Sequence, residues 1–144
     1  FKMRTKMHDK FQKDLGEIQQ LFHGSRNCNL LSITMGGLII PPSSAGHVTG
    51  RMFGDGIYGA NRSTKALNYS VGYWGGSNKS NLAYLFIVEF AMGKVYECSR
   101  ALYGGVPSGY NSIYAKGGAD LKNDEFIVPR TDQCRITHLL ELSE

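Results

Sequence analysis

Three segments of this sequence carry side chains that could bind a ligand or take part in catalysis. His23 is followed by Gly24 and Ser25, Tyr58 follows a glycine-rich stretch, and Glu125 opens a short apolar run. An imidazole can hold a ligand by a hydrogen bond, a phenol ring offers a flat face, and a carboxylate stabilises positive charge that develops during a reaction. Taken singly, each segment also has a purely structural interpretation, because such residues are common at strand ends and turns.

The elements expected around these residues are short strands and one helix. Residues 18–22 predict a strand that ends just before His23, and residues 57–58 predict another. A helix is expected over residues 63–70, because it opens on a serine, which is a good N-cap. The apolar run at residues 125–128 predicts a further strand.

The rest of the chain is expected to consist mainly of strands. Residues 82–92 are apolar at both odd and even positions, which predicts a central strand covered on both faces. A short helix is expected over residues 30–35, between an asparagine cap and a glycine pair. The breaker-rich segments 41–53 and 72–80 predict a lid or cleft wall and a flexible connector. Further strands are expected at 95–98, 112–115 and 136–142.

Residues 1–15 place apolar side chains at a spacing of mostly four, with lysine and arginine between them. This pattern predicts an amphipathic basic helix that packs on the domain. The alternative is a contact with nucleic acid or a partner through the basic side chains.

Length and composition restrict the class of protein. The chain has 144 residues, 42% hydrophobic and 11% aromatic side chains and 18 glycines, which favour one strand-rich domain over a helical bundle. The sequence contains no apolar stretch of the length that a membrane-spanning helix needs, and the net charge of +4 identifies no partner by itself. The three cysteines lack the paired spacing of zinc sites, so an intracellular protein with free thiols and no metal site is expected. A start at Phe1 rather than methionine is typical of a fragment.

In their order along the chain, these segments resemble the catalytic domain of the poly(ADP-ribose) polymerase family, which belongs to the diphtheria-toxin-like ADP-ribosyltransferases. The resemblance implies an α+β fold of two mainly antiparallel packed sheets, a split β-sandwich with a few short helices. It implies a single catalytic domain over 1–144, in which the basic helix over 1–17 precedes an NAD-binding core over 18–144. The resemblance rests on LFHGSR at 21–26, GRMFGDGIY at 50–58, KALNY at 65–69, PSGYNS at 107–112, NDEFIV at 123–128 and QCRI at 133–136.

The resemblance also implies NAD as the substrate and assigns the residues of the site. The His-Tyr-Glu triad of the family falls on His23, Tyr58 and Glu125. Two phenol rings would face the cationic nicotinamide ring, an attraction typically of about 0.5 to 2 kcal/mol. The other residues assigned to NAD binding are Gly24, whose backbone would meet the carboxamide, Ser25, Arg51, Lys65 and Tyr69.

The implied reaction is the transfer of ADP-ribose from NAD to a protein, a nucleic acid or a growing poly(ADP-ribose) chain. Breaking the bond between nicotinamide and ribose leaves positive charge on the sugar, as in glycoside hydrolysis. Glu125 is expected to stabilise this oxocarbenium-like transition state, and His23 to donate a hydrogen bond to a ribose hydroxyl.

Two positions depart from the family pattern. Ala66 stands where many members have a serine that contacts the carboxamide, and its presence is expected to weaken NAD binding several-fold. Gly59 stands where an aromatic residue is common, and it is expected to widen or loosen that wall of the site.

Two alternatives keep the same fold. In one, the domain binds ADP-ribose or a partner without catalysis. In the other, water takes the place of the acceptor and the protein is an NAD glycohydrolase. The intact Glu125 favours an enzyme over a binding module.

Overall fold

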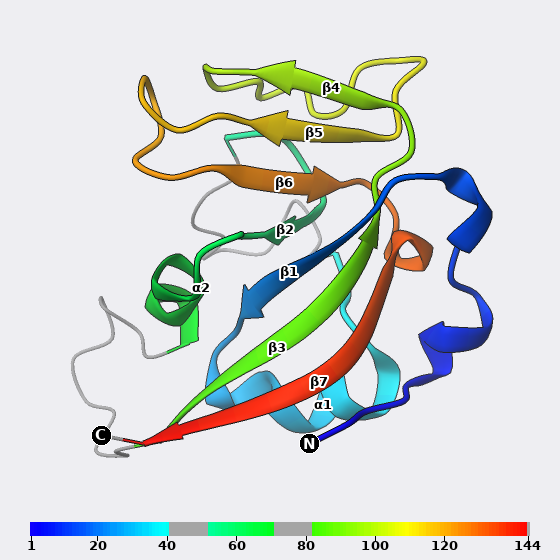
Figure 1. Ribbon diagram of the computed structural model, residues 1–144, viewed down its shortest axis with the longest axis vertical. Coiled ribbons are helices and arrows are strands. Elements are labelled where there is room, and N and C mark those ends of the chain that lie inside the picture. Colours follow the sequence, from blue (N-terminus) through cyan, green and yellow to red (C-terminus); the bar gives the residue numbers. More distant parts are fainter. Residues whose placement is uncertain (41–51, 71–81, 144) are drawn as a thin grey trace.

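The computed structural model describes residues 1–40, 52–70 and 82–143. Within these residues the strands form two sheets, as Figure 1 shows. The first sheet has the order β1-β3-β7, and both of its pairings are antiparallel. The predicted central strand is therefore confirmed as β3. The strands of this sheet are β1 Ile18–Gly24, β3 Leu82–Ala91 and β7 Cys134–Ser143.

The second sheet has the order β2-β6-β5-β4 among the described residues. β6 runs antiparallel to β2 and β5, whereas β4 and β5 run parallel. A parallel pair requires a crossover rather than a tight turn, and residues 99–111 provide it. The predicted α+β fold with two mainly antiparallel sheets is confirmed. The strands are β2 Ile57–Gly59, β4 Val95–Cys98, β5 Ser112–Ala115 and β6 Glu125–Val128.

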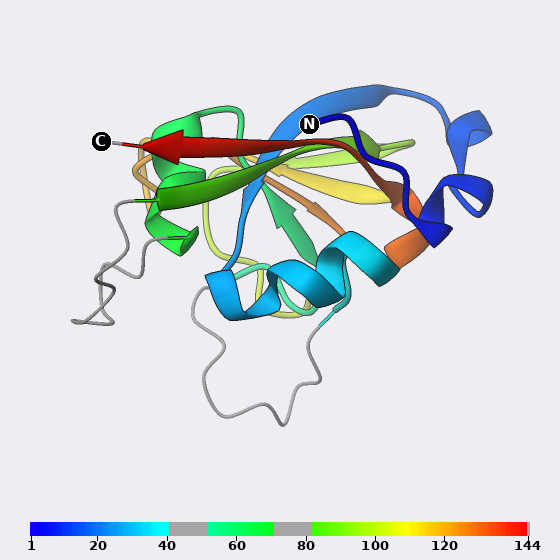
Figure 2. The same cartoon turned by 90° about the horizontal axis from the view of Figure 1, so that it is seen from below.

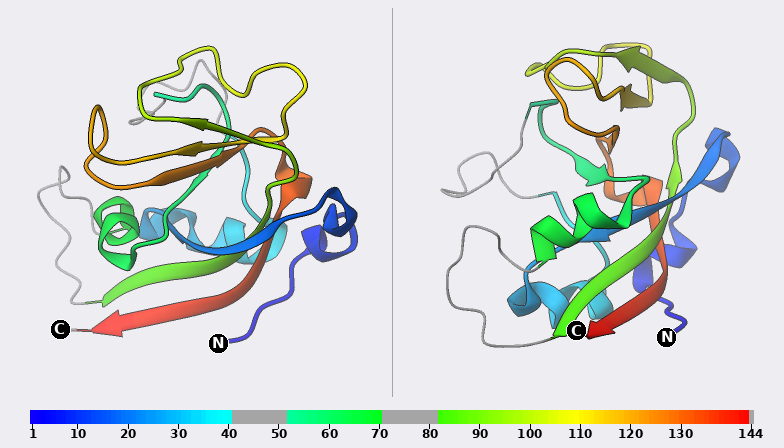
Figure 3. Two further views of the ribbon diagram at one scale, coloured as in Figure 1. Left: turned by 45° about the horizontal axis from the view of Figure 1, so that its top comes forward. Right: turned by 60° about the vertical axis from the view of Figure 1, so that its left-hand side comes forward.

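An apolar core joins the two sheets. Val88 and Phe90 of β3 are fully buried, and they share a cluster with Ile57 of β2 and with Phe126 and Val128 of β6. Figures 1 and 3 show that the strands of the second sheet run across the direction of the first. Burying side chains of this size contributes about 1.5 to 3 kcal/mol each. This core holds β2 and β6 in fixed positions relative to β1 and β3.

Two α-helices lie beside the first sheet, and both confirm predictions from the sequence. α1 Leu30–Gly36 follows the 3₁₀ turn η3 Asn27–Asn29 and lies below the sheet in Figure 2. It ends at Gly37, whose φ of 87° suits a residue without a side chain. α2 Ser63–Ser70 contacts β1 and β3. Figure 3 shows α2 beside β1, so residues that follow β2 return to the end of β1.

The predicted basic helix over residues 1–15 is wrong. The first residues of the chain pair with the edge of β7 instead, where the Met3 amide donates to the Thr137 carbonyl at 2.9 Å. The open edge of β7 satisfies backbone groups that a helix would have satisfied internally, so the spacing of apolar side chains did not decide the structure. Two short 3₁₀ turns follow, η1 Lys6–Asp9 and η2 Lys13–Leu15.

Other predictions concern segments and groups away from the sheets. Most of the predicted lid over 41–53 and all of the connector over 72–80 lie outside the described residues. None of the helices that the structure describes has both the length and the apolar character needed to cross a membrane. Cys28, Cys98 and Cys134 are free thiols, and burial raises the pKa of the Cys134 thiol well above its ordinary value.

Gln133 ties the two sheets together through its side-chain amide. It lies in the 3₁₀ turn η4 Thr131–Gln133, is 2% exposed, and donates to the carbonyls of Ala91 at 3.1 Å and Asn111 at 2.8 Å. We expect Gln133→Leu to lower the free energy of unfolding by about 2 kcal/mol, because buried carbonyls would lose their donor. Urea unfolding would measure this loss. The exposed Gln12→Leu is the matched control, with an expected change within about 0.5 kcal/mol; equal losses in the two variants would contradict the prediction.

Candidate active site

Main-chain hydrogen bonds bring the three triad residues onto neighbouring strands. Phe22 and Ala60 exchange both of their main-chain hydrogen bonds, at 2.8 and 2.9 Å, and so join β1 to the chain just after β2. β2 pairs in turn with β6. His23 therefore lies at the end of β1, Tyr58 in β2, and Glu125 at the start of β6.

The register of β2 and β6 places two of these side chains on one face of the second sheet. Tyr58 lies directly opposite Ile127. Side chains of directly opposite residues share a face, and residues two apart in a strand do as well. Glu125 therefore projects to the same face of the sheet as Tyr58. The sequence placed both residues in strands, and the register decides that their faces agree.

His23 is anchored on the backbone of the second triad residue. Its Nδ1 lies 2.7 Å from the Tyr58 carbonyl oxygen. Burial lowers the pKa of the imidazole below its ordinary value of 6.5, and the hydrogen bond to Tyr58 opposes that shift. A carbonyl oxygen can only accept, so Nδ1 carries the proton and Nε2 of the neutral ring is an acceptor. From the sequence, His23 is expected to donate a hydrogen bond to a ribose hydroxyl. With the proton on Nδ1, Nε2 of the neutral ring would instead accept a hydrogen bond from that hydroxyl.

Glu125 is a buried carboxylate with a cation beside it. Its side chain is 6% exposed, and its Oε1 lies 3.4 Å from Nζ of Lys65, whose side chain is 13% exposed. The same ammonium donates to the carbonyl oxygens of Asn123 at 3.1 Å and Asp124 at 3.4 Å. A buried charge is tolerated when it is paired and hydrogen-bonded. Lys65 thus links α2 to the start of β6 and places a positive charge beside the carboxylate.

Tyr58 is fixed by its own hydroxyl group. This hydroxyl donates to the Gly54 carbonyl at 2.6 Å and accepts from the Phe53 amide at 3.1 Å. The ring is partly buried and packs on a cluster that includes Phe53, Ile113 and Ile127. Because the hydroxyl is bound to the chain itself, the group that Tyr58 could present to a ligand is the ring.

The structure describes only some of the other predicted binding residues. Gly24 is the last residue of β1, and Ser25 follows it and accepts a hydrogen bond from the Asn29 amide group at 3.2 Å. Arg51 lies outside the described residues. Tyr69 lies in the last turn of α2, and its side chain is outside the described part of the chain. The structure therefore joins His23 to Tyr58 by a hydrogen bond and Lys65 to Glu125 by an ion pair, and it places Tyr58 and Glu125 on one face of the second sheet.

The expectation that Gly59 widens the site is not met. A Cβ built at Gly59 would lie 2.8 Å from the Phe90 ring and 3.1 Å from a methyl carbon of Leu21. These two core residues fill the space that a side chain at this position would use, so the glycine allows close packing rather than an opening. Ala66 is 2% exposed on the inner side of α2.

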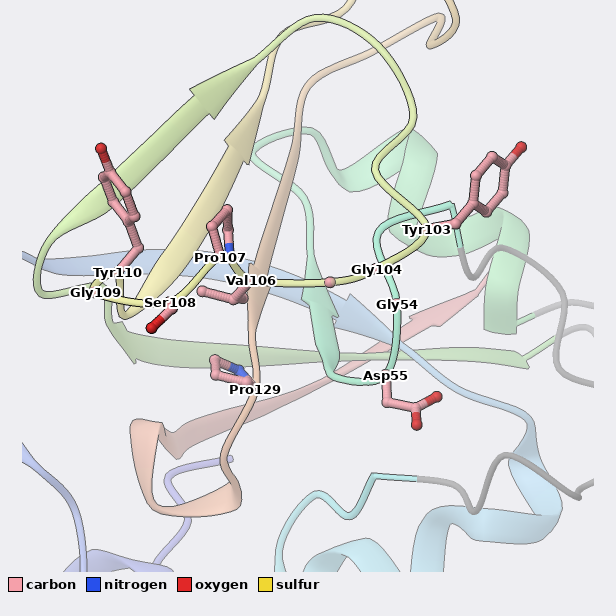
Figure 4. A pocket seen from close by; sticks show the side chains of 11 residues that line it. Gly54, Asp55, Tyr103, Gly104, Val106, Pro107, Ser108, Gly109, Tyr110 and Pro129 are labelled. Carbon is pink, nitrogen blue, oxygen red and sulfur yellow. The ribbon is translucent and has the colours of Figure 1, made fainter.

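A pocket of about 570 Å³ lies among the loops at the end of the second sheet where β2 and β5 begin and β6 ends, as Figure 4 shows. Asp55, Tyr103 and Pro129 are among the residues that line it, and the side chains of Asp55 and Tyr103 point in different directions. Pro129 follows the end of β6, whereas Glu125 opens that strand. Among the described residues, none of the predicted site side chains lines this pocket, but the Tyr58 hydroxyl donates to the carbonyl of Gly54, which does line it.

Sequence reasoning missed the neighbour of the acidic triad residue. Asp124 accepts hydrogen bonds from the Tyr114 hydroxyl at 2.7 Å and the Gly117 amide at 2.9 Å. The sequence shows two adjacent carboxylates at 124 and 125. It does not show which of them forms hydrogen bonds within the fold. Among the described residues, no cluster of three or more histidine, cysteine or acidic side chains could hold a metal ion.

The fold and this arrangement define a protein of the ADP-ribosyltransferase class. A family model of the poly(ADP-ribose) polymerase catalytic domain matches residues 1–118. The chain therefore belongs to the poly(ADP-ribose) polymerase catalytic-domain family. The matched stretch includes His23, Tyr58 and Lys65 but ends before Glu125, whose place in the site follows from the pairing of β2 with β6 and from its contact with Lys65.

Particular relatives share the family name. The chain is 28% identical over 157 residues to a poly(ADP-ribose) polymerase-like protein, 100L, of Invertebrate iridescent virus 6, which covers 98% of this chain and 82% of the viral protein. It is 39% identical over 93 residues to poly(ADP-ribose) polymerase 2 of Homo sapiens, covering 65% of this chain but 15% of the human protein. It is 27% identical over 143 residues to the mono-ADP-ribosyltransferase PARP4 of Mus musculus, covering 92% of this chain and 7% of that protein. The family membership supports ADP-ribosyltransferase activity with NAD as the substrate.

Proposed function

We propose that this protein is an ADP-ribosyltransferase that cleaves the bond between nicotinamide and ribose in NAD and passes ADP-ribose to an acceptor. The observation that carries the proposal is the buried carboxylate of Glu125, held by Lys65 on the same face of the sheet as Tyr58. A carboxylate fixed in this way needs no rearrangement when positive charge develops next to it.

In the proposed chemistry, Glu125 acts on the ribose of NAD. As the glycosidic bond of NAD lengthens, positive charge spreads over C1 and the ring oxygen of the ribose, and the bonding electrons leave with nicotinamide. Glu125 stabilises that charge, and it helps to orient the incoming hydroxyl group through the ribose 2-hydroxyl. The acceptor oxygen then bonds to C1, and its proton is released. The attraction acts in the transition state more than in the ground state, so it raises the rate constant kcat.

NAD binding in this proposal depends on the ends of β1 and β2. Nε2 of His23 accepts from a ribose hydroxyl, and Gly24 lets the carboxamide approach the main chain. The ring of Tyr58, together with that of Tyr69, faces the cationic nicotinamide ring. Ser25 adds a polar contact, and Arg51 remains assigned to NAD by the family resemblance alone. An intracellular location belongs to the proposal, because the three cysteines are free thiols.

A labelling experiment tests this function and separates it from the alternatives. The protein is incubated with labelled NAD, with and without nucleic acid, and the products are resolved on a gel and by mass spectrometry. Labelled protein or nucleic acid, as a single band or a ladder, supports transfer. Free ADP-ribose with no labelled acceptor identifies an NAD glycohydrolase. Intact NAD identifies a binding module and contradicts the proposal.

The neutral state of His23 leads to a prediction on pH. The pKa of His23 is lowered in the folded protein, so below 6.5 the unfolded chain binds more protons than the native one. The free energy of unfolding is therefore expected to rise with pH up to about 6.5. The contribution of the neutral His23 to this free energy is expected to be lost as the pH falls below that value. Urea unfolding at about pH 7.5 and about pH 5.5 measures the difference. The variant His23→Gln is expected to show a smaller difference, and an unchanged one would contradict the prediction.

A further inference from the structure

Asp124 is the centre of a hydrogen-bonded group at the entrance to β6. Its carboxylate accepts from the Tyr114 hydroxyl at 2.7 Å, from the Gly117 amide at 2.9 Å and from the Asn61 side-chain amide at 3.4 Å. Tyr114 lies in β5, Gly117 in the turn between β5 and β6, and Asn61 in the chain between β2 and α2. One side chain therefore joins three segments that surround the start of β6.

Charge strengthens these bonds. The hydrogen bond from the Gly117 amide, and then that from Tyr114, lower the pKa of Asp124, with a smaller contribution from Arg62. The hydrogen bond to Asp124 in turn raises the pKa of Tyr114. The pair is thus an ionised carboxylate and a neutral phenol, which is the stronger type of hydrogen bond.

The phenol is itself held by packing. The Tyr114 ring stacks on Phe126 of β6, with ring centroids 4.8 Å apart and an angle of 20° between planes. Tyr114 and Phe126 are opposite each other in the ladder between β5 and β6. The hydroxyl therefore reaches Asp124 from a ring that has little freedom to move.

The geometry connects this group to the catalytic carboxylate. Side chains alternate between the two faces of a strand, so Phe126 projects to one face of β6 and Glu125 to the other. Asp124 directly precedes the strand and is bound by the Tyr114 hydroxyl, whose ring stacks on Phe126. Fixing Asp124 from one face sets the direction in which Glu125 leaves the strand on the opposite face. The Lys65 ammonium donates to the main-chain carbonyl of Asp124 and pairs with Glu125, so the same residue also sets the distance between α2 and β6.

We propose that the Tyr114–Asp124 hydrogen bond positions Glu125 for the transfer step, an inference that rests on the function proposed above. Tyr114 and Asp124 are positioning residues, because they act on the reacting atoms only through Glu125 and Lys65. Loss of the bond lowers kcat and leaves the KM for NAD nearly unchanged, because the NAD contacts assigned to β1 and β2 do not involve this group.

The test uses variants that delete or weaken the hydrogen bond between Tyr114 and Asp124. Tyr114→Phe keeps the stacking on Phe126 and deletes the hydroxyl, and Asp124→Asn removes the charge. Each is expected to lower kcat for nicotinamide release about tenfold, with KM changed less than about twofold. Because both substitutions act on this bond, the loss of kcat in the double variant should be smaller than the product of the two single losses. Additive losses, or a rise in KM with unchanged kcat, would overturn the proposal.

Two matched controls separate positioning from a general loss of structure. Tyr96→Phe removes a hydroxyl from the neighbouring strand β4, and Asp120→Asn alters a carboxylate that accepts from the Ala101 amide on the surface. Both are expected to retain kcat within about twofold. A tenfold loss of kcat in either control would overturn the proposal.

Amide hydrogen exchange distinguishes failure of this inference from failure of the proposed function. If the unaltered protein releases no nicotinamide, the proposed function fails, while exchange over residues 117–125 still tests the hydrogen-bonded group. Faster exchange there in Tyr114→Phe, with the rest of the chain unchanged, supports the positioning role. Exchange equal to that of the unaltered protein overturns it.

Discussion

The variant Glu125→Gln is expected to bind NAD and to lose transfer by a factor of about 10² to 10³. Glutamine has the shape of glutamate without its charge, so contacts with the substrate survive while the stabilisation of the cationic ribose is lost. The loss should appear in kcat rather than in KM, because the attraction grows only as the glycosidic bond lengthens. Nicotinamide release at saturating NAD and the binding of NAD by calorimetry would measure the two effects separately.

The control for this variant is Glu97→Gln. Glu97 lies in β4, is exposed, and pairs with Lys116 at 3.5 Å on the surface. Its substitution removes one carboxylate that pairs with neither the triad residues nor Lys65, so turnover is expected to stay within about twofold of the unaltered protein. Near-normal transfer by Glu125→Gln would show that this carboxylate does not stabilise the transition state, and it would contradict the proposed mechanism.

The variant Lys65→Met is expected to lose both stability and transfer. Methionine keeps the apolar length of the lysine and removes the ammonium group, which leaves the Glu125 carboxylate buried without its cation. Removing one partner of a fully buried pair costs about 3 to 5 kcal/mol, and Lys65 keeps some contact with solvent, so a loss of about 2 kcal/mol is expected. Transfer should fall by at least about tenfold, because the carboxylate is no longer held in place.

A second substitution tests the cause of that loss. In Lys65→Met combined with Glu125→Gln, no charge is left buried, so the double variant should be more stable than Lys65→Met alone. Urea unfolding of all variants measures this difference. Lys116→Met is the control, because its pair with Glu97 is exposed on both sides and contributes little. If the double variant is no more stable than Lys65→Met, the unpaired carboxylate is not what destabilises the protein.

Local patterns in the sequence were enough where one strand or helix could be recognised by itself. The apolar run at 82–92 identified the central strand β3, because a strand between two others is covered on both sides. Ser63 stands at the start of α2 and Gly37 at the end of α1, where the short-range helix signals in the sequence predicted them. Family motifs then placed His23, Tyr58 and Glu125 in the order that the resemblance requires.

The helical spacing of apolar residues gave a wrong prediction at the N-terminal segment, because its backbone forms hydrogen bonds with a strand distant in the sequence. Residues 1–15 have the spacing of a helix, yet their first residues pair with β7, which follows more than a hundred positions later in the sequence. The expectation that Gly59 widens the site was wrong for a similar reason. The residues that fill the space beside it, Phe90 and Leu21, are distant in the sequence. Both outcomes depend on contacts between residues far apart in the sequence, which a local sequence pattern does not contain.

By itself, the sequence predicted the family, the order of the strands along the chain and the candidate site residues, because these depend on short motifs. Only the tertiary structure decided that Lys65 pairs with Glu125, that Nδ1 of His23 bonds to the Tyr58 carbonyl, and that Asp124 bonds to Tyr114 and Gly117. Those properties depend on distances of a few ångströms between β1, β2, α2, β5 and β6 and on the burial that their packing creates. Charge and protonation respond to that environment, which no stretch of sequence contains.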